Sequence, residues 1–151
     1  MKACLLRISA WAFALNAIWE FAQCPIFYDM TSNSRTTGIA WMALAIIADV
    51  VVVIALVLTA GLFNSRKLFL APEARNFVVV LTLSFIVSVL LEWLPRAQHR
   101  WNYSERMPTL TVFGVAVGLL PILQITFLPA LSLFLSVRLR RRGAGSSAKR
   151  E

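Results

Sequence analysis

The stretch GIAWMALAIIADVVVVIALVLTAGLF, residues 38–63, decides the fold. Its only charged residue is Asp49, which lies near the middle of an otherwise apolar run. An α-helix needs about 20 consecutive apolar residues to cross the hydrocarbon core of a bilayer. The stretch therefore predicts a membrane-spanning helix that carries one carboxyl group near its centre.

Three further apolar runs are long enough for the same interpretation. The first and third are followed at once by a proline-containing segment, at Pro25 and Pro95, where a helix is expected to end. The first run starts with MKACLLR, but Trp11 and Glu20 are atypical of a cleaved signal peptide, so we expect a retained helix. The predicted helices cover residues 3–23, 38–63, 76–94 and 110–139.

Composition gives the same class of protein. Hydrophobic residues make up 59% of the 151 residues, and only 7 residues are acidic, too few to cover a soluble surface. We expect an all-α integral membrane domain over residues 1–139, a bundle of four transmembrane helices, followed by a basic, disordered cytoplasmic tail at 140–151. The net charge of +8 comes from cations between and after the apolar runs. They form no patch with interleaved aromatic residues, so a nucleic-acid partner is not expected.

The distribution of lysine and arginine predicts the orientation. With four helices both termini share one side, and that side holds eleven of the 15 basic residues. Because cytoplasmic loops carry the excess of basic residues, both termini are expected in the cytoplasm. The resulting localisation is a multi-pass protein of a bacterial inner membrane.

Polar residues interrupt the apolar helices at helical spacing. Asn16, Glu20 and Gln23 share one face of the first helix, with Trp19 beside them. Ionisable groups inside a membrane are costly, by about 2.5–3.5 kcal/mol for Asp on insertion scales, and usually face the interior of the bundle. This face is therefore expected to point inward.

The other three helices carry matching polar positions. Ser84, Ser88 and Glu92 form one stripe on the third helix, whereas Asp49 and Gln124 lie near the middle of the second and fourth. The stripes can line one polar cavity with Asp49 and Gln124 at its floor. Since a carboxyl group in a low dielectric can keep its proton, the expected catalytic acids and bases are Glu20, Asp49 and Glu92. The expected substrate-binding residues are Asn16, Trp19, Gln23, Tyr28, Trp93, Arg96, Trp101, Tyr103 and Gln124.

Simpler interpretations exist for several of these residues. Trp93 can belong to the aromatic belt at the membrane interface, and Glu92 can form an ion pair with Arg96 one turn later. Asn16 and Gln124 can be hydrogen-bonding contacts between helices. The GVAVG segment, residues 114–118, is a GxxxG pattern typical of helix packing.

Together these motifs resemble an uncharacterised family of small bacterial four-helix integral membrane proteins. The resemblance implies the fold and the inner-membrane location and carries no activity. There is a looser similarity of kind to the emopamil-binding-type sterol isomerases, although their histidine-centred pattern is missing here. The residues that carry the family resemblance are Asn16, Trp19, Glu20, Gln23, Pro25, Tyr28, Asp49, Glu92, Trp93, Trp101, Tyr103, Met107, Pro108, Gly118, Leu119, Pro121 and Gln124.

Three functions compete at this point. The first is a membrane-embedded enzyme that isomerises, cyclises or hydrates an isoprenoid- or lipid-like substrate by acid–base chemistry, without a metal or cofactor. The second is a small proton-coupled transporter, working as a homodimer. The third is a non-catalytic subunit or assembly factor of a membrane complex. Membrane lipids and a hydrophobic small molecule are the expected partners.

Overall fold

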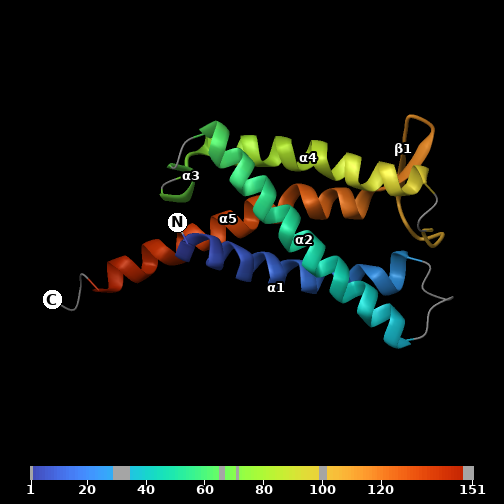
Figure 1. Cartoon of the computed structure of the whole chain (residues 1–151), viewed down its shortest axis with the longest axis horizontal. Coiled ribbons are helices and arrows are strands. Elements are labelled where there is room, and N and C mark those ends of the chain that lie inside the picture. Colours follow the sequence, from blue (N-terminus) through green and yellow to red (C-terminus); the bar gives the residue numbers. More distant parts are fainter. Residues whose placement is uncertain (1, 29–34, 65–66, 71, 99–101, 148–151) are drawn as a thin grey trace.

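The chain folds into a bundle of four long helices, seen from the side in Figure 1. A computed structural model describes residues 2–28, 35–64, 67–70, 72–98 and 102–147. The long helices are α1 (Lys2–Phe27), α2 (Arg35–Asn64), α4 (Ala74–Ala97) and α5 (Leu119–Ser147). The smaller elements are the short helix α3 (Lys67–Leu70) and an antiparallel hairpin of β1 (Thr109–Val112) and β2 (Val115–Gly118).

Each long helix contains a segment that is long and apolar enough to cross a membrane. The prediction of four such helices in a helical bundle is therefore confirmed. Large apolar side chains on the outside of the bundle, such as Phe13 and Leu44, are exposed. The four segments are Lys2–Phe27, Thr37–Phe63, Ala74–Ala97 and Leu119–Leu139.

The helices alternate in direction along the bundle. α1 packs against α2 and α5, α4 packs mainly against α5, and α2 crosses the other three. The N-terminus, α3 and the far end of α5 lie at one end of the bundle, which we call the terminal end (Figure 1). The end of α1, the start of α2 and the hairpin lie at the other, which we call the hairpin end.

The prediction of a helix over residues 110–139 is wrong at its start. Residues 109–118 form the hairpin, and α5 begins at Leu119. The β-branched residues in this segment favour strands, and the two-residue turn at Phe113 and Gly114 has positive φ at both positions, 48° and 79°. The apolar run is longer than one span needs, so 21 residues of α5 still suffice to cross a membrane. The interpretation of residues 114–118 as a helix-packing GxxxG pattern is therefore wrong too, because Gly114 and Gly118 belong to the hairpin.

Three other predicted boundaries differ from the structure. α1 continues past Pro25 to Phe27, and α4 continues past Pro95 to Ala97, because a proline in the last turn interrupts few backbone hydrogen bonds. α5 continues to Ser147, so most of the tail predicted to be disordered is helical. Its run of arginines consists of good helix formers.

The interior has two parts of different chemistry. Towards the terminal end, apolar side chains such as Ile8, Val57 and Leu133 pack into one buried cluster, which we call the apolar half. α3 closes this cluster at the terminal end with Leu68 and Phe69. Towards the hairpin end, polar side chains are buried among apolar ones such as Ile46 and Ile122, and we call this part the polar half. Its buried members include Asn16, Glu20, Gln23, Ser88, Glu92, Gln124 and Thr126.

Candidate functional site

Gln124 of α5 is the centre of the polar half. Its amide nitrogen Nε2 donates towards three oxygens on two other helices, Asn16 Oδ1 at 3.0 Å, Glu20 Oε1 at 2.8 Å and Asp49 Oδ2 at 2.7 Å. Its carbonyl Oε1 accepts a hydrogen bond of 2.8 Å from Gln23 Nε2. One side chain of α5 therefore joins α1 and α2, and we call these five residues the Gln124 cluster.

Glu20 is the most fully bonded carboxyl group of the cluster. Oε1 accepts from both Gln23 Nε2 at 3.0 Å and Gln124 Nε2, and Oε2 accepts from Cys24 Sγ at 2.9 Å. Gln23 is held in turn by Trp19, whose Nε1 donates to Gln23 Oε1 at 2.8 Å. The side chain of Glu20 is only 5% exposed, so its orientation is fixed by neighbours and not by solvent.

Asp49 differs from Glu20 in bonding and in exposure. Within the described residues its side chain accepts one hydrogen bond, from Gln124 Nε2. It is half-buried, whereas Glu20 is buried. Among the described residues no lysine or arginine pairs with Asp49 or Glu20. The two carboxyl groups are therefore close neighbours without a described cation between them.

The two hydrogens of Gln124 Nε2 are too few for the oxygens that surround it. An amide nitrogen carries two hydrogens, whereas three oxygens lie within hydrogen-bond distance of Gln124 Nε2. Two neighbouring carboxyl groups in a low dielectric do not both ionise readily, so the pair can retain one proton. That proton makes the cluster able to act as an acid.

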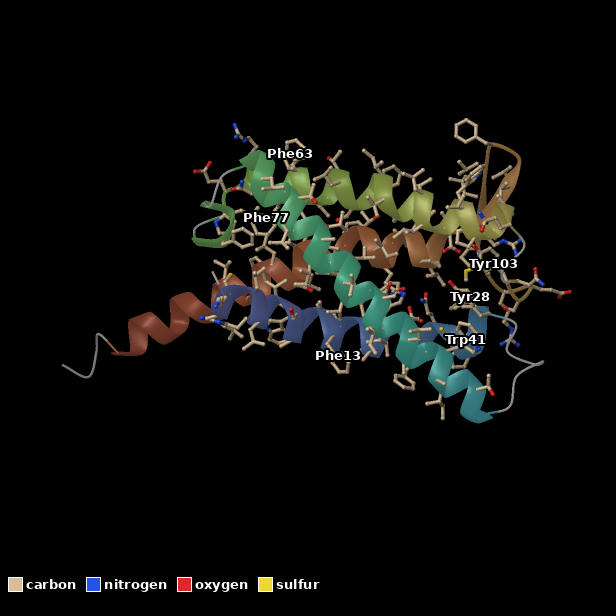
Figure 2. The ribbon with its side chains drawn as sticks, in the orientation of Figure 1. Phe13, Tyr28, Trp41, Phe63, Phe77 and Tyr103 are labelled. Carbon is tan, nitrogen blue, oxygen red and sulfur yellow. The ribbon has the colours of Figure 1, made fainter. Side chains whose placement is uncertain are left out.

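A second polar group lies at the hairpin end, around Tyr103. The Tyr103 hydroxyl donates to Glu92 Oε1 and accepts from the backbone N–H of Gly118 at 2.9 Å. The ring packs edge-on against Tyr28, with centroids 5.8 Å apart, and the two labels lie side by side in Figure 2. Burial, reinforced by the charge of Glu92, raises the pKa of Tyr28 above its ordinary value. Tyr28 therefore remains a neutral phenol.

Gly118 is required by the close approach of Tyr103. A Cβ atom at position 118 would lie 3.2 Å from both Cζ and the hydroxyl oxygen of Tyr103, and 3.2 Å from Cδ of Pro121. The glycine thus lets its own N–H reach the Tyr103 hydroxyl.

Trp93 and Arg96 fasten the hairpin to the last turns of α4. Trp93 Nε1 donates to the carbonyl of Val112 at 3.0 Å, and Arg96 Nε donates to the carbonyl of Ala116 at 3.3 Å. The Arg96 guanidinium also lies 4.5 Å from the centroid of the Tyr103 ring. Both side chains, predicted to bind substrate, make these contacts within the protein.

An open groove adjoins the Tyr103 group. It has a volume of about 490 Å³ and mixed polar and apolar walls. One wall is the end of α1, and the other is the segment that follows Tyr103. Its lining residues are Pro25, Ile26, Tyr28, Tyr103, Ser104, Glu105 and Arg106.

The sequence-predicted residues thus fall into two groups. Asn16, Gln23, Gln124 and the carboxyl groups of Glu20 and Asp49 hydrogen-bond directly to one another instead of lining an open cavity. Trp19 donates a hydrogen bond to Gln23 of this cluster. The remaining described residues belong to the Tyr103 group. Trp101 lies outside the described residues. The second group consists of Tyr28, Glu92, Trp93, Arg96 and Tyr103.

Sequence reasoning missed two contributors to these groups. Cys24 donates to Glu20, and the i, i+4 spacing of these residues on α1 was the available signal. The backbone of Gly118 had no such signal, because it depends on the hairpin.

Between the Gln124 cluster and the terminal end, α4 and α5 carry buried hydroxyl groups. Ser88 Oγ and Thr126 Oγ1 lie 3.3 Å apart between α4 and α5. Within the described structure the buried hydroxyls of Ser84 and Ser132 have no hydrogen-bond partner. No group of three His, Cys, Asp or Glu side chains suited to a metal ion occurs in the described part of the chain.

Comparison with protein-family models, curated proteins and solved structures finds no match for this chain. The functional argument therefore depends on the geometry of the two polar groups.

Proposed function

We propose that the chain is a bacterial inner-membrane protein with four transmembrane helices and cytoplasmic termini. The four apolar helices and the exposed apolar residues on their outer faces support insertion. The excess of basic residues at the terminal end supports the orientation. In this arrangement Asp49 and Gln124 lie near the middle of the bilayer, and the Tyr103 group lies near the outer interface. We include in this proposal that the chain is one of the small bacterial four-helix membrane proteins that it resembles.

We further propose that the protein is a membrane-embedded enzyme that uses the Gln124 cluster for acid–base chemistry on an isoprenoid- or lipid-like substrate. The observation that carries the proposal is the convergence of Glu20 and Asp49 on one amide nitrogen. Their environments differ, because Glu20 is buried with three hydrogen bonds and Asp49 is half-buried with one. Unequal environments of this kind give two carboxyl groups different roles.

The roles follow from this inequality. Glu20 is the positioned member, since three donors fix its carboxyl group. We assign the transferable proton to Asp49, which is half-buried and accepts one described hydrogen bond, so a substrate dissolved in the bilayer can approach it. Asp49 gives its proton to a carbon of a substrate double bond. This leaves a carbocation at the other carbon of the double bond. The Asp49 carboxylate then removes a proton from the next carbon beyond the cation, which returns Asp49 to its starting state and moves the double bond.

Deuterium incorporation tests this proposal. Protein purified in mild detergent is incubated in D2O with a lipid extract of a bacterial membrane, and the extract is analysed by mass spectrometry. We expect one hydrophobic molecule to gain deuterium with the unmodified protein and none with Asp49→Asn. Ser132→Ala, a change on α5 at a hydroxyl without a described partner, is the control and should leave the incorporation unchanged. Identical extracts from the unmodified protein and Asp49→Asn would contradict an acid–base enzyme.

A proton-coupled transporter is the second candidate, and the buried hydroxyls favour it. Ser88 and Thr126 adjoin the Gln124 cluster, and the buried hydroxyls of Ser84 and Ser132 continue from there into the apolar half, where Val80 and Leu133 lie. Intramembrane carboxyl groups followed by polar side chains are typical of proton pathways. Acidification of liposomes that depends on Asp49, together with unaltered lipid extracts, would favour this function over the enzyme.

A further inference from the structure

The tip of the hairpin carries an aromatic residue in an unusual setting. Phe113 is 93% exposed and has φ of 48°, in the left-handed region that side chains other than glycine rarely adopt. Exposure of a phenyl ring and backbone strain both oppose this arrangement in water. A contact outside the described chain that buries the ring would offset both.

Two hydrogen bonds set the direction of the hairpin. Ala116, nearer the base, is bonded to Arg96, whereas Val112, next to the tip, is bonded to Trp93, almost one turn earlier on α4. The two bonds therefore hold the hairpin against the last turns of α4. In Figure 1 the hairpin likewise stands beside the end of α4 and does not extend the long axis.

The surface around the hairpin is continuous with the apolar outside of α4. Leu90 lies one turn before Trp93 on the same face and is exposed, and Leu94 is also exposed. Leu110 of β1 is exposed as well, and the strand that carries it is bonded to α4 through Trp93 and Val112. Phe113 follows Val112 in the chain and is therefore close to the surface that the proposed membrane insertion places in lipid.

The depth of the hairpin follows from its backbone. The two strands bond to each other, but the outer edge of each strand has peptide groups that need water. Such an edge fits the headgroup region and not the hydrocarbon core. Trp93 and Arg96, which hold the hairpin, are residue types typical of that region.

From these observations we propose that the β1–β2 hairpin is an interfacial anchor, and that Phe113 contacts the acyl chains just below the lipid headgroups. The proposal rests on membrane insertion but not on the chemistry of the Gln124 cluster. The partner is the bilayer itself, because the hairpin that carries the exposed ring is fixed to the end of α4, where Leu90 and Leu94 are exposed. A protein partner, or a second copy of this chain, is the alternative that the experiment must separate.

Fluorescence quenching tests the anchor. Single-cysteine variants are made in a chain with Cys4→Ala and Cys24→Ala, labelled with an environment-sensitive dye and reconstituted into phosphatidylethanolamine and phosphatidylglycerol vesicles. Phe113→Cys probes the tip, Phe85→Cys on the exposed middle of α4 probes insertion, and Glu105→Cys probes the water-exposed end. Because Phe113 is exposed, its replacement removes little packing.

We expect a blue-shifted emission at position 113 relative to 105, strong quenching by lipids with a nitroxide near the headgroup, and little quenching by aqueous iodide. Quenching of the 113 label by iodide as strong as at 105 would overturn the proposal. Protection of the 113 label from both quenchers would also overturn it, in favour of a protein partner. Failure of deep nitroxides to quench the label at 85 would instead show that the chain is not inserted, which contradicts the proposed function separately.

Discussion

The two halves of the bundle solve the same packing problem with different side chains. In the apolar half, Ile8, Val57 and Leu133 meet as they would in any helical bundle. In the polar half, the same helices α1, α2 and α5 meet through Glu20, Asp49 and Gln124. The apolar half joins these helices mainly through apolar side chains, beside a polar contact between Cys4 and Ser136. The carboxyl groups of the second half therefore need a reason beyond packing, and acid–base chemistry supplies one.

The largest effect is expected from removing the centre of the polar half. Gln124→Leu keeps the volume but leaves Glu20, Asp49 and Asn16 without their shared donor. Breaking a buried polar network on one side typically costs several kcal/mol, so we expect a loss of about 4 kcal/mol in unfolding free energy. Unfolding by sodium dodecyl sulfate in mixed micelles measures this. Leu123→Ala, at the exposed neighbouring position, is the control, and a loss of equal size there would contradict the role of the cluster.

A cavity in the apolar half should reduce stability without changing chemistry. Leu133 is fully buried, and Leu→Ala changes at such sites cost about 3 kcal/mol. We expect Leu133→Ala to unfold earlier in the same titration. Its deuterium incorporation per folded molecule should equal that of the unmodified protein. A loss of incorporation in the folded fraction would show that the two halves are not separable.

Gly118→Ala tests the link between the hairpin and the Tyr103 group. The added methyl meets the Tyr103 hydroxyl and Pro121 at 3.2 Å, and crowding of this kind costs about 1–2 kcal/mol. We expect the double variant Gly118→Ala with Tyr103→Phe to be less affected than the sum of the two single variants, since the phenyl ring lacks the crowded oxygen. Simple additivity in the sodium dodecyl sulfate titration would contradict the contact.

The smallest effect on stability is expected at the tip of the hairpin, where the change should not destabilise the protein. Phe113→Gly removes the left-handed strain, which costs about 1 kcal/mol, and takes no buried contact away. Stability in detergent should rise slightly or stay unchanged. Asn at the same position tolerates the conformation and is the matched control. A clear loss of stability in detergent would mean that the ring packs against the protein.

Much of the bundle was accessible from the sequence, because its apolar runs have the length that a span requires. The fourth run was misread where β-branched residues and the Phe113–Gly114 turn override apolar composition, which does not distinguish a strand from a helix. Helical spacing correctly grouped Asn16, Glu20 and Gln23 on one buried face.

The sequence could not show which stripes touch. Glu92 was expected to line one cavity with Glu20, yet it bonds to Tyr103, because α4 packs mainly on α5 and α1 packs on α2 and α5. Helix order is set by packing among all four helices and leaves no trace in the spacing of any one of them. Gln124 was identified as polar and central, but its role as the shared donor depends on that order.

The retained proton is the central claim, and infrared spectroscopy of the protein at neutral pH tests it most directly. We predict a carbonyl band of a protonated carboxyl group that shifts in D2O and disappears in Asp49→Asn. The absence of an Asp49-dependent band, with both groups present as carboxylates, would contradict the account.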